Sequence, residues 1–165
     1  MPTSTNNSFP LLKESLGSQA VQQLADCLHE IEPNFKHAAF INAANNGLNK
    51  LELKARVYHL IEVLHQHLPQ DFEQAAEVLC QVKQRQFKVT EAAVKAFTAW
   101  PLIDYVAVYG LQHPELSLNT LAQLTSLFSA EFAIRPFIQQ HYELTFEHLH
   151  DWCGSSDHHL RRLVS

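Results

Sequence analysis

Glycine is scarce in this chain, and the scarcity limits the folds that the sequence can adopt. Only 4 glycines occur among 165 residues, and stretches that alternate Val, Ile, Thr or Tyr with polar residues are few. Tight hairpin turns rely on glycine, so there is little material for a β-sheet. With 46% hydrophobic and 18% charged residues, the composition is that of a globular protein. Together these features predict an all-α protein.

Cysteines are also few, and they lie far apart. Cys27, Cys80 and Cys153 form no C-x-x-C pair and no even-numbered disulfide framework, so we expect three buried, small apolar side chains. No apolar stretch approaches the length of a membrane span, and the first residues lack the charged and apolar regions of a signal peptide. The sequence therefore predicts no membrane partner and a cytoplasmic location.

Basic residues do not predominate. The chain has 12 basic and 17 acidic residues, for a formal net charge of -5. A general nucleic-acid binder usually carries a basic excess. However, the acidic excess lies mostly before Gln81, so a local basic groove in the second half is compatible with the composition.

Metal-binding and phosphate-binding motifs are missing as well. The chain has 11 histidines, but the i,i+2 pairs His65/His67 and His148/His150 diverge on a helix and do not easily share an ion. There is no H-E-x-x-H motif, no Cys/His grouping and no Gly-rich phosphate loop. We therefore expect no metal and no cofactor.

What the sequence does contain is a series of short amphipathic segments. Residues 1–8 are predicted to form a disordered tail and residues 9–165 a single helical domain, with an irregular connector within 87–98. In the first half, helices are predicted from Ser18 as a cap to Pro33 as a stop, from Asn34 as a cap to Asn46-Gly47 as an end, from about Lys50 to His67 with Pro69 as a stop, and after Asp71 as a cap. In the second half, helices are predicted from Pro101 to Leu111, after Ser117 as a cap, over Glu131–Gln140 with an interruption at Pro136, over Glu143–Cys153 with Gly154 as an end, and after Ser156 as a cap. Helices this short cannot bury their apolar faces alone, so the series predicts a HEAT-like α-solenoid of stacked antiparallel pairs.

The segment from Lys50 to His67 gives the clearest prediction of which side faces the core. Its apolar residues recur at helical spacing. We expect an inward-facing stripe made of Leu53, Val57, Leu60, Ile61 and Leu64, with Lys54 and Arg56 elsewhere on the helix.

Several stretches of the chain carry recognisable motifs. Residues 128–137 read F-S-A-E-F-A-I-R-P-F, residues 100–111 hold W-P-L followed by G-L, and residues 159–165 read H-L-R-R-L-V-S after Trp152. They resemble the F-T-x-E-F-x-I-R-P-F, W-P-L…G-L and W…H-V-R-R-L-x-S motifs of the AlkC-type DNA alkylation-repair glycosylases. An L-E-L-K-x-R segment at 51–56 matches too, and the resemblance extends from about Phe35 onward.

The resemblance implies a function and a binding partner. It implies HEAT-like helix pairs that curve into a groove for double-stranded DNA. It also implies excision of bases methylated on N3, such as 3-methyladenine and 3-methylcytosine, by a monomer without metal or cofactor. Since the family's last motif runs on into further helices, we expect this chain to be an N-terminal portion that excises little on its own.

Glu131 is the residue that the resemblance places first for catalysis. An alkylated base is positively charged and leaves readily, so a carboxylate near the sugar stabilises the electron-poor transition state and holds the attacking water. Arg135 lies at i+4 from Glu131 and is a DNA-binding candidate. The alternative interpretation is that the two residues form an ion pair on an exposed helix face.

Four further residues are candidates for the DNA-binding groove. The resemblance assigns phosphate contact to Arg161 and Arg162. Adjacent residues diverge on a helix, so we expect one of them, Arg162, to enter the groove. Trp100 and Asp104 are also expected there. The alternative interpretation is that Trp100 packs in the core and that Asp104 is a first-turn carboxylate stabilised by the helix dipole. Trp152 is expected in the core.

A non-catalytic interpretation stays open at this point. Helical repeats make concave surfaces that bind protein or DNA without any chemistry. An enzyme needs Glu131, Arg135 and Arg162 to converge on one concave face, whereas a scaffold does not.

Overall fold

The protein is all-α over residues 11–165, which are the residues that the computed structural model describes. Its elements are the 3-10 helices η1 (Leu12–Leu16) and η2 (Leu48–Lys50) and the α-helices α1 (Ser18–Ile31), α2 (His37–Asn45), α3 (Leu53–His67), α4 (Phe72–Arg85), α5 (Ala92–Tyr109), α6 (Pro114–Leu124), α7 (Glu131–Gln140), α8 (Tyr142–Cys153) and α9 (His158–Val164). No strand occurs within that range, so the all-α prediction is confirmed. The predicted tail, residues 1–8, lies outside the described residues.

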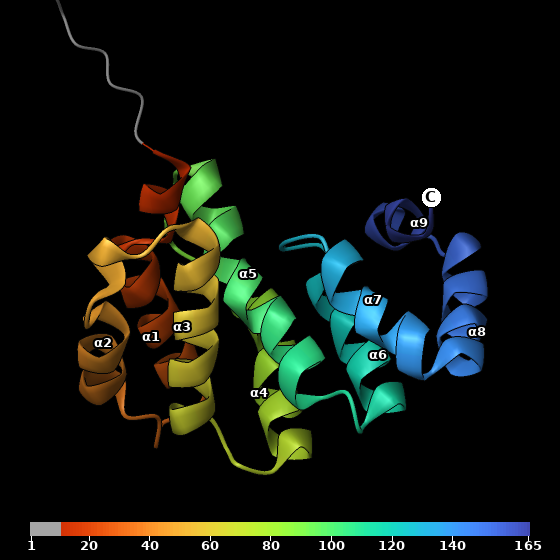
Figure 1. Cartoon of the computed structure of the whole chain (residues 1–165), viewed down its shortest axis with the longest axis horizontal. Coiled ribbons are helices and arrows are strands. Elements are labelled where there is room, and N and C mark those ends of the chain that lie inside the picture. The colour runs from red at the N-terminus through yellow and green to blue at the C-terminus, as the bar shows by residue number, and fades with distance from the viewer. Residues whose placement is uncertain (1–10) are drawn as a thin grey trace, which may run out of the picture.

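The helices are stacked in two layers (Figure 1). Helices α3, α5 and α7 lie side by side in one layer, and α4, α6 and α8 form the other. The consecutive helices α5 and α6, and likewise α7 and α8, pack against each other across the layers. Helices α1 and α2 close one end, and α9 packs on α8 at the other end. This is the HEAT-like array of helix pairs that the sequence predicts.

The predicted helix ends are confirmed where glycine or aspartate marks them. Asp71 caps α4 by accepting a hydrogen bond from the backbone N–H of Gln74, at 3.1 Å. Gly47 follows α2 with a φ of 75°, a left-handed conformation that glycine adopts without strain. Gly154 is the C-terminal cap of α8.

The serine and asparagine caps are misplaced by the sequence analysis. Ser18 is the first residue of α1, after Gly17, and Asn34 stands in a turn before α2, whose N-cap is Lys36. Asp157, not Ser156, caps α9 by accepting from the N–H of His159, at 2.8 Å. A short polar side chain near a helix start therefore does not by itself fix the capping position.

Ser117 is also not a cap, because it lies inside α6 and is buried. Its hydroxyl donates a hydrogen bond to the carbonyl of Gly110, at 2.6 Å. Pro114 instead occupies the first turn of α6, where its missing N–H has no intrahelical partner to lose.

Pro101 lies in the interior of α5, and its prediction as a helix start is wrong. The helix begins at Ala92, so the irregular connector is confined to residues 86–91. An interior proline costs about 3 kcal/mol. Because α5 packs against α1, α3, α4, α6 and α7, burial of its apolar side chains offsets that cost.

The cysteine prediction is correct only in part. Cys27 is buried and Cys80 half-buried, and all three thiols are free. Cys153 is exposed near the end of α8, which contradicts the expectation of three buried side chains.

The inner face of α3 contains one residue that the sequence analysis placed elsewhere. Most of the predicted stripe is buried, Leu53 is half-buried, and Lys54 is exposed as expected. Arg56, however, is only 1% exposed. The prediction for Arg56 is wrong because hydrogen-bond acceptors that are distant in the sequence surround its guanidinium group.

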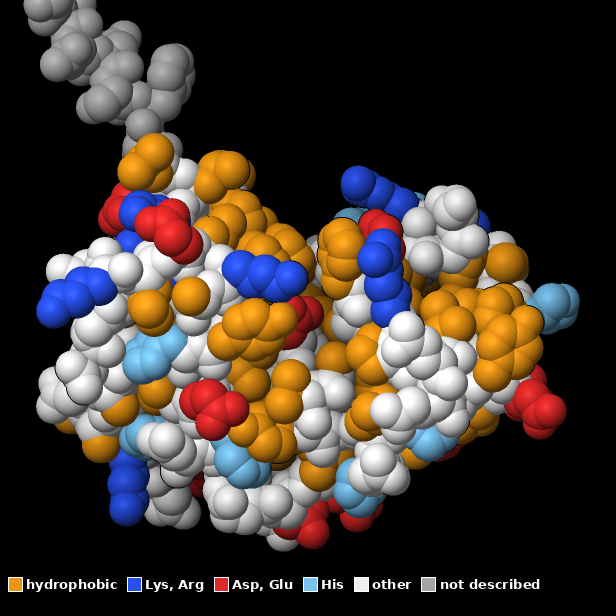
Figure 2. All heavy atoms as spheres, viewed as in Figure 1, with side chains coloured by type: hydrophobic (Ala, Val, Ile, Leu, Met, Phe, Trp, Pro, Cys, Tyr) orange, Lys and Arg blue, Asp and Glu red, His pale blue; other side chains and the backbone are white. Residues whose placement is uncertain are grey.

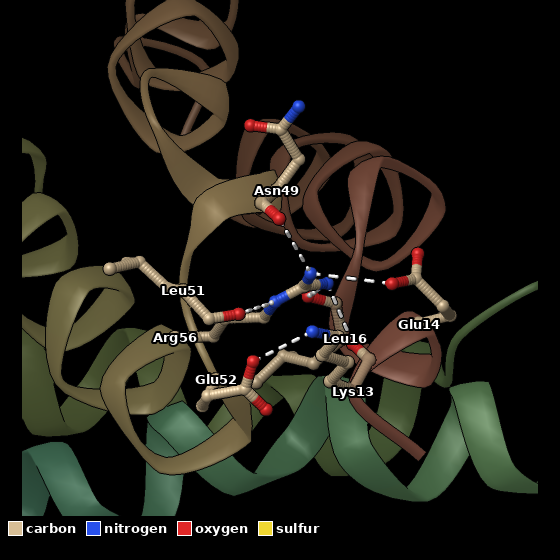
Figure 3. A network of polar contacts seen from close by, with 7 residues as sticks. All are labelled: Lys13, Glu14, Leu16, Asn49, Leu51, Glu52 and Arg56. Carbon is tan, nitrogen blue, oxygen red and sulfur yellow. Dashed lines mark hydrogen bonds and ion pairs between the residues drawn. The ribbon is translucent and has the colours of Figure 1, made fainter. Parts of the chain in front are cut away.

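The Arg56 guanidinium joins three segments of the chain (Figure 3). Its Nε donates to the carbonyl of Leu51, at 2.9 Å, and its Nη1 donates to the carbonyl of Lys13, at 2.7 Å. Longer contacts reach the carbonyls of Leu16 and Asn49 and the carboxylate of Glu14. A buried charge is tolerated only when it is hydrogen-bonded in this way. The network fastens η1 and the turn after η2 to the start of α3.

Replacing Arg56 by methionine is expected to lower the free energy of unfolding by about 3 kcal/mol or more. Several buried carbonyls would lose their donor, and each such loss costs about 1–3 kcal/mol. The exposed Arg85 at the end of α4 supplies the matched control, since Arg85→Met should change stability by no more than about 0.5 kcal/mol. Urea unfolding measures both, and equal effects would show that the Arg56 network adds no stability.

Candidate nucleic-acid interface

A pocket of about 450 Å³ opens between the three helices of one layer. It is lined by Lys54 and Tyr58 of α3, by Trp100, Asp104, Ala107 and Val108 of α5, and by Phe132, Ala133 and Pro136 of α7. We call it the groove pocket. Figure 2 shows a hollow on this face, between the α3–α5 side and the α7–α9 side, with apolar side chains along it and basic side chains on both of its sides.

Trp100 and Asp104 form a fixed pair in this pocket. They lie one turn apart on α5, and the indole Nε1–H donates to the Asp104 carboxylate at 2.9 Å. The Trp100 ring stacks on Phe128, with ring centroids 5.2 Å apart and an interplanar angle of 13°. The structure thus brings two of the sequence candidates together, and it holds the carboxylate in one orientation.

The surroundings of Asp104 disfavour its charged form. Burial raises the pKa of the Asp104 carboxyl above its usual value, while the Trp100 hydrogen bond and the Lys54 ammonium group offset part of that rise. The carboxylate therefore carries its negative charge in partly apolar surroundings, where its field is less screened than in water. Such a group is suited to stabilising a positive charge that develops close by.

The rim of the groove pocket exposes large apolar side chains. Tyr58 is 54% exposed, Val108 49% and Phe132 63%. A contiguous exposed apolar patch usually marks a surface that binds a partner. Tyr58 and Phe132 are not among the site residues predicted from the sequence. For Tyr58, the available signal was that this aromatic residue lies off the predicted apolar stripe of its helix.

Glu131 and Arg135 lie beside the groove pocket and do not line it. Their side chains, 60% and 58% exposed, form an i,i+4 ion pair at 3.3 Å. The Arg135 guanidinium also lies over the ring of Phe132, 4.4 Å from its centroid. The pair is thus connected to the pocket through the wall residue Phe132.

Arg162 lines a second hollow of about 370 Å³ on the other side of Phe128. His159 and Ser129 line it as well. Arg161 points elsewhere, because its guanidinium donates to the carbonyl of Ser155 at 2.6 Å. The predicted divergence of the two arginines is therefore present, and Arg162 is the one that faces a hollow.

The fold and this face define an all-α helical-repeat protein with an open, aromatic-lined groove. Among solved structures, the chain is similar to the Pseudomonas fluorescens alkylpurine DNA glycosylase AlkC bound to DNA containing an abasic site analog. The TM-score is 0.80 and the identity 31%, over 94% of this chain and 42% of that one. The similarity confirms the resemblance to AlkC-type glycosylases.

Two further comparisons bear on how far this similarity extends. The chain is 28% identical over 155 residues to the uncharacterised protein YhaZ of Bacillus subtilis, across 93% of this chain and 41% of YhaZ. It thus spans about two-fifths of the length of each of these two proteins. No protein-family model matches the chain.

Two other features are absent from residues 11–165. No group of three or more His, Cys, Asp or Glu side chains is arranged there to hold a metal ion. Within the same range, no helix has both the length and the apolar character needed to cross a membrane.

Replacing Asp104 by asparagine is expected to leave the stability at pH 7 unchanged or higher. A carboxyl with a raised pKa binds its proton more readily in the folded state. The fold therefore loses stability as the pH rises from the unfolded pKa through the raised folded one. Asparagine keeps the shape of the side chain and removes that penalty. Urea unfolding at pH 7 measures the effect.

Asp157→Ala is a comparison in which the pKa shift of the carboxyl, and therefore the expected change in stability, has the opposite sign. The His159 backbone N–H lowers the pKa of Asp157, so its stabilisation is present above the unfolded pKa and is lost as the pH falls through the folded one. Its removal should therefore lower the stability at pH 7. A loss of stability in Asp104→Asn as large as that in Asp157→Ala would mark Asp104 as a structural residue.

Proposed function

We propose that this chain supplies the lesion-binding face of a DNA glycosylase that removes N3-alkylated bases from double-stranded DNA. The proposed substrates are 3-methyladenine and 3-methylcytosine. The observation that carries the proposal is the Trp100–Asp104 pair in an apolar pocket, on a chain that is similar to AlkC over nearly all of its length.

The proposed chemistry requires a negative charge near the sugar. Alkylation makes the base a cation, so the C1′–N bond breaks with its electron pair passing to the base, which becomes neutral. The oxygen of a water molecule bonds to C1′, and the proton that this water loses passes through a carboxylate to the solvent. The carboxylate also stabilises the positive charge that builds up on the sugar in the transition state. Ordinary bases are spared because they carry no such charge.

Asp104 and Glu131 are the two candidates for this carboxylate. Glu131 is the candidate of the sequence motif, and its ion pair with Arg135 would hold it charged and oriented. Asp104 is recessed in the groove pocket and held by Trp100, whereas Glu131 is mostly exposed to water. Because electrostatic stabilisation is stronger where water is excluded, the geometry favours Asp104 for the sugar and Glu131 for the edge of the groove.

Basic side chains on this face are proposed to hold the DNA backbone. Arg162, in the second hollow, is assigned to a phosphate, and Arg135 to the backbone near the rim. Arg161 is assigned to orienting the start of α9 through Ser155. On a chain with a net charge of -5, these few contacts imply weak binding, and we expect little excision from the chain alone.

Two isosteric substitutions in the full-length gene product distinguish the carboxylates. Asp104→Asn is expected to lower single-turnover excision of 3-methyladenine by roughly two orders of magnitude or more, the usual cost of losing one electrostatic catalytic group. Glu131→Gln is expected to cause a similar loss if Glu131 is the main carboxylate, and a much smaller one if it lies only at the edge.

Glu143→Gln, on the exposed side of α8, serves as the control and should excise at the wild-type rate. Wild-type rates in both test variants would remove both residues from the chemistry. Damaged DNA that is bound without release of any base would instead support a non-catalytic helical-repeat module.

Arg162→Ala is expected to weaken binding of this chain to duplex DNA containing an abasic-site analogue. Loss of one phosphate contact should also reduce the slope of log K against log salt by about 0.9. Fluorescence anisotropy at several salt concentrations measures both quantities. Arg85→Ala, on α4, should change neither, and an unchanged slope in Arg162→Ala would exclude the phosphate contact.

A further inference from the structure

A second pocket of about 390 Å³ lies on a different side of α5. Five ring side chains line it: His65, Phe72, Tyr105, Tyr109 and His113. Tyr105 and Tyr109 belong to it, whereas Asp104 and Val108 belong to the groove pocket. Adjacent positions on a helix point about 100° apart, so the two pockets open in different directions. We call this second one the ring-lined pocket.

The rings are packed in a defined arrangement. The His65 ring stacks on Tyr109, with centroids 3.8 Å apart and an interplanar angle of 8°. Tyr105 lies beneath them, 5.0 Å from Tyr109 and only 1% exposed. His113 stacks on Phe72 at 5.4 Å. The pocket thus has a buried aromatic floor and two aromatic walls.

The position of Phe72 in this pocket depends on a glycine. A Cβ atom at Gly110 would overlap the Phe72 ring and the Ser117 hydroxyl. Gly110 has a negative φ, so glycine is required here for close approach and not for its backbone conformation. The ring-lined pocket is therefore built by tight packing between α4, α5 and α6.

The charge around the pocket has a single sign. Asp71 and Glu73 line it, and Glu62 accepts a hydrogen bond from the Tyr109 hydroxyl at 3.1 Å. None of these carboxylates forms a salt bridge within residues 11–165, and no Lys or Arg lines the pocket.

Both phenols stay neutral and electron-rich at physiological pH. Burial raises the pKa of Tyr105 to about 12. Burial also raises the pKa of Tyr109, and the Glu62 carboxylate adds to that rise. Donation of a hydrogen bond to a carboxylate further increases the electron density of the Tyr109 ring.

We propose that the ring-lined pocket binds an alkylated ammonium group. Aromatic faces attract such cations through the ring quadrupole, and the alkyl groups bury apolar area against the rings. The carboxylates, which form no salt bridge within residues 11–165, attract a cation over a long range and repel phosphate, so the ligand is not the DNA backbone. The volume lies in the range of about 300–1,000 Å³ that is typical of small-ligand sites. This site is independent of the proposed function.

Choline and its uncharged carbon isostere, 3,3-dimethylbutan-1-ol, test the proposal directly. Each is titrated into the chain without DNA, and the ring resonances of the histidines and tyrosines are followed by NMR. Choline is expected to bind at least about tenfold more tightly than the isostere, because only choline carries the charge that the rings and carboxylates recognise. Equal affinity of the two compounds would overturn the proposal.

Two variants locate the binding site. Tyr109→Leu removes an aromatic face, and Glu73→Gln removes a carboxylate, so each should weaken choline binding by roughly threefold or more. Tyr142→Leu and Glu143→Gln change the same residue types on the exposed side of α8 and should leave binding unchanged.

Circular dichroism shows whether each variant is folded. Should Tyr109→Leu unfold, His113→Leu decides in its place, because His113 is exposed and its loss removes a wall of the pocket without disturbing the core. A folded wall variant that binds choline like the wild type would assign binding to another surface.

Discussion

One buried cation determines how the first part of this protein is assembled. The guanidinium of Arg56 gives its hydrogen bonds mainly to backbone carbonyls, which come from η1, from η2 and from the turn before α3. Removing a charge from water costs free energy unless new hydrogen-bond partners replace the lost water molecules. Here the backbone carbonyls of the chain are those partners. The same helix carries Lys54 and Tyr58 into the groove pocket. The placement of that wall therefore depends on a network behind it.

Helix α5 is the second element on which both pockets depend. One of its faces supplies Trp100 and Asp104 to the groove pocket, and the next supplies Tyr105 and Tyr109 to the ring-lined pocket. Its central position in its layer, packed against α1, α3, α4, α6 and α7, offsets the cost of the interior Pro101. The charges are also unevenly distributed: carboxylates without a salt bridge within residues 11–165 gather near the ring-lined pocket, while arginines occur beside the groove. Basic side chains thus lie beside the groove although the chain as a whole has a net charge of -5.

The sequence predicts the fold well because the residues that start, stop and orient a helix lie within or next to it. Apolar spacing, Asp71, Gly47 and Gly154 are readable within a few residues of where they act. Pro101 is misread because its tolerance depends on neighbours packed around α5. Arg56 is misread because three of its acceptors, in Lys13, Glu14 and Leu16, lie far away in the chain. Such tertiary contacts cannot be predicted from the spacing of apolar residues along one helix.

The candidate site is predictable only in part. Trp100 and Asp104 are one turn apart on the same helix, so their pairing follows from helical geometry. Tyr58 and Phe132 form walls of the pocket only because α3 and α7 flank α5. A local sequence pattern does not predict that arrangement of helices. Glu131 rests on its motif, and its role stays a proposal.

The Arg56 network differs from a surface contact between arginine and phosphate in its response to dissolved salt. Most of its acceptors are uncharged carbonyls in buried or half-buried positions, so these hydrogen bonds depend less on dissolved ions than an ion pair does. Contacts between surface arginines and phosphates are screened by the same ions. If the proposed phosphate contacts of Arg162 and Arg135 form, rising ionic strength weakens them, whereas the hydrogen bonds of Arg56 to uncharged carbonyls depend much less on salt.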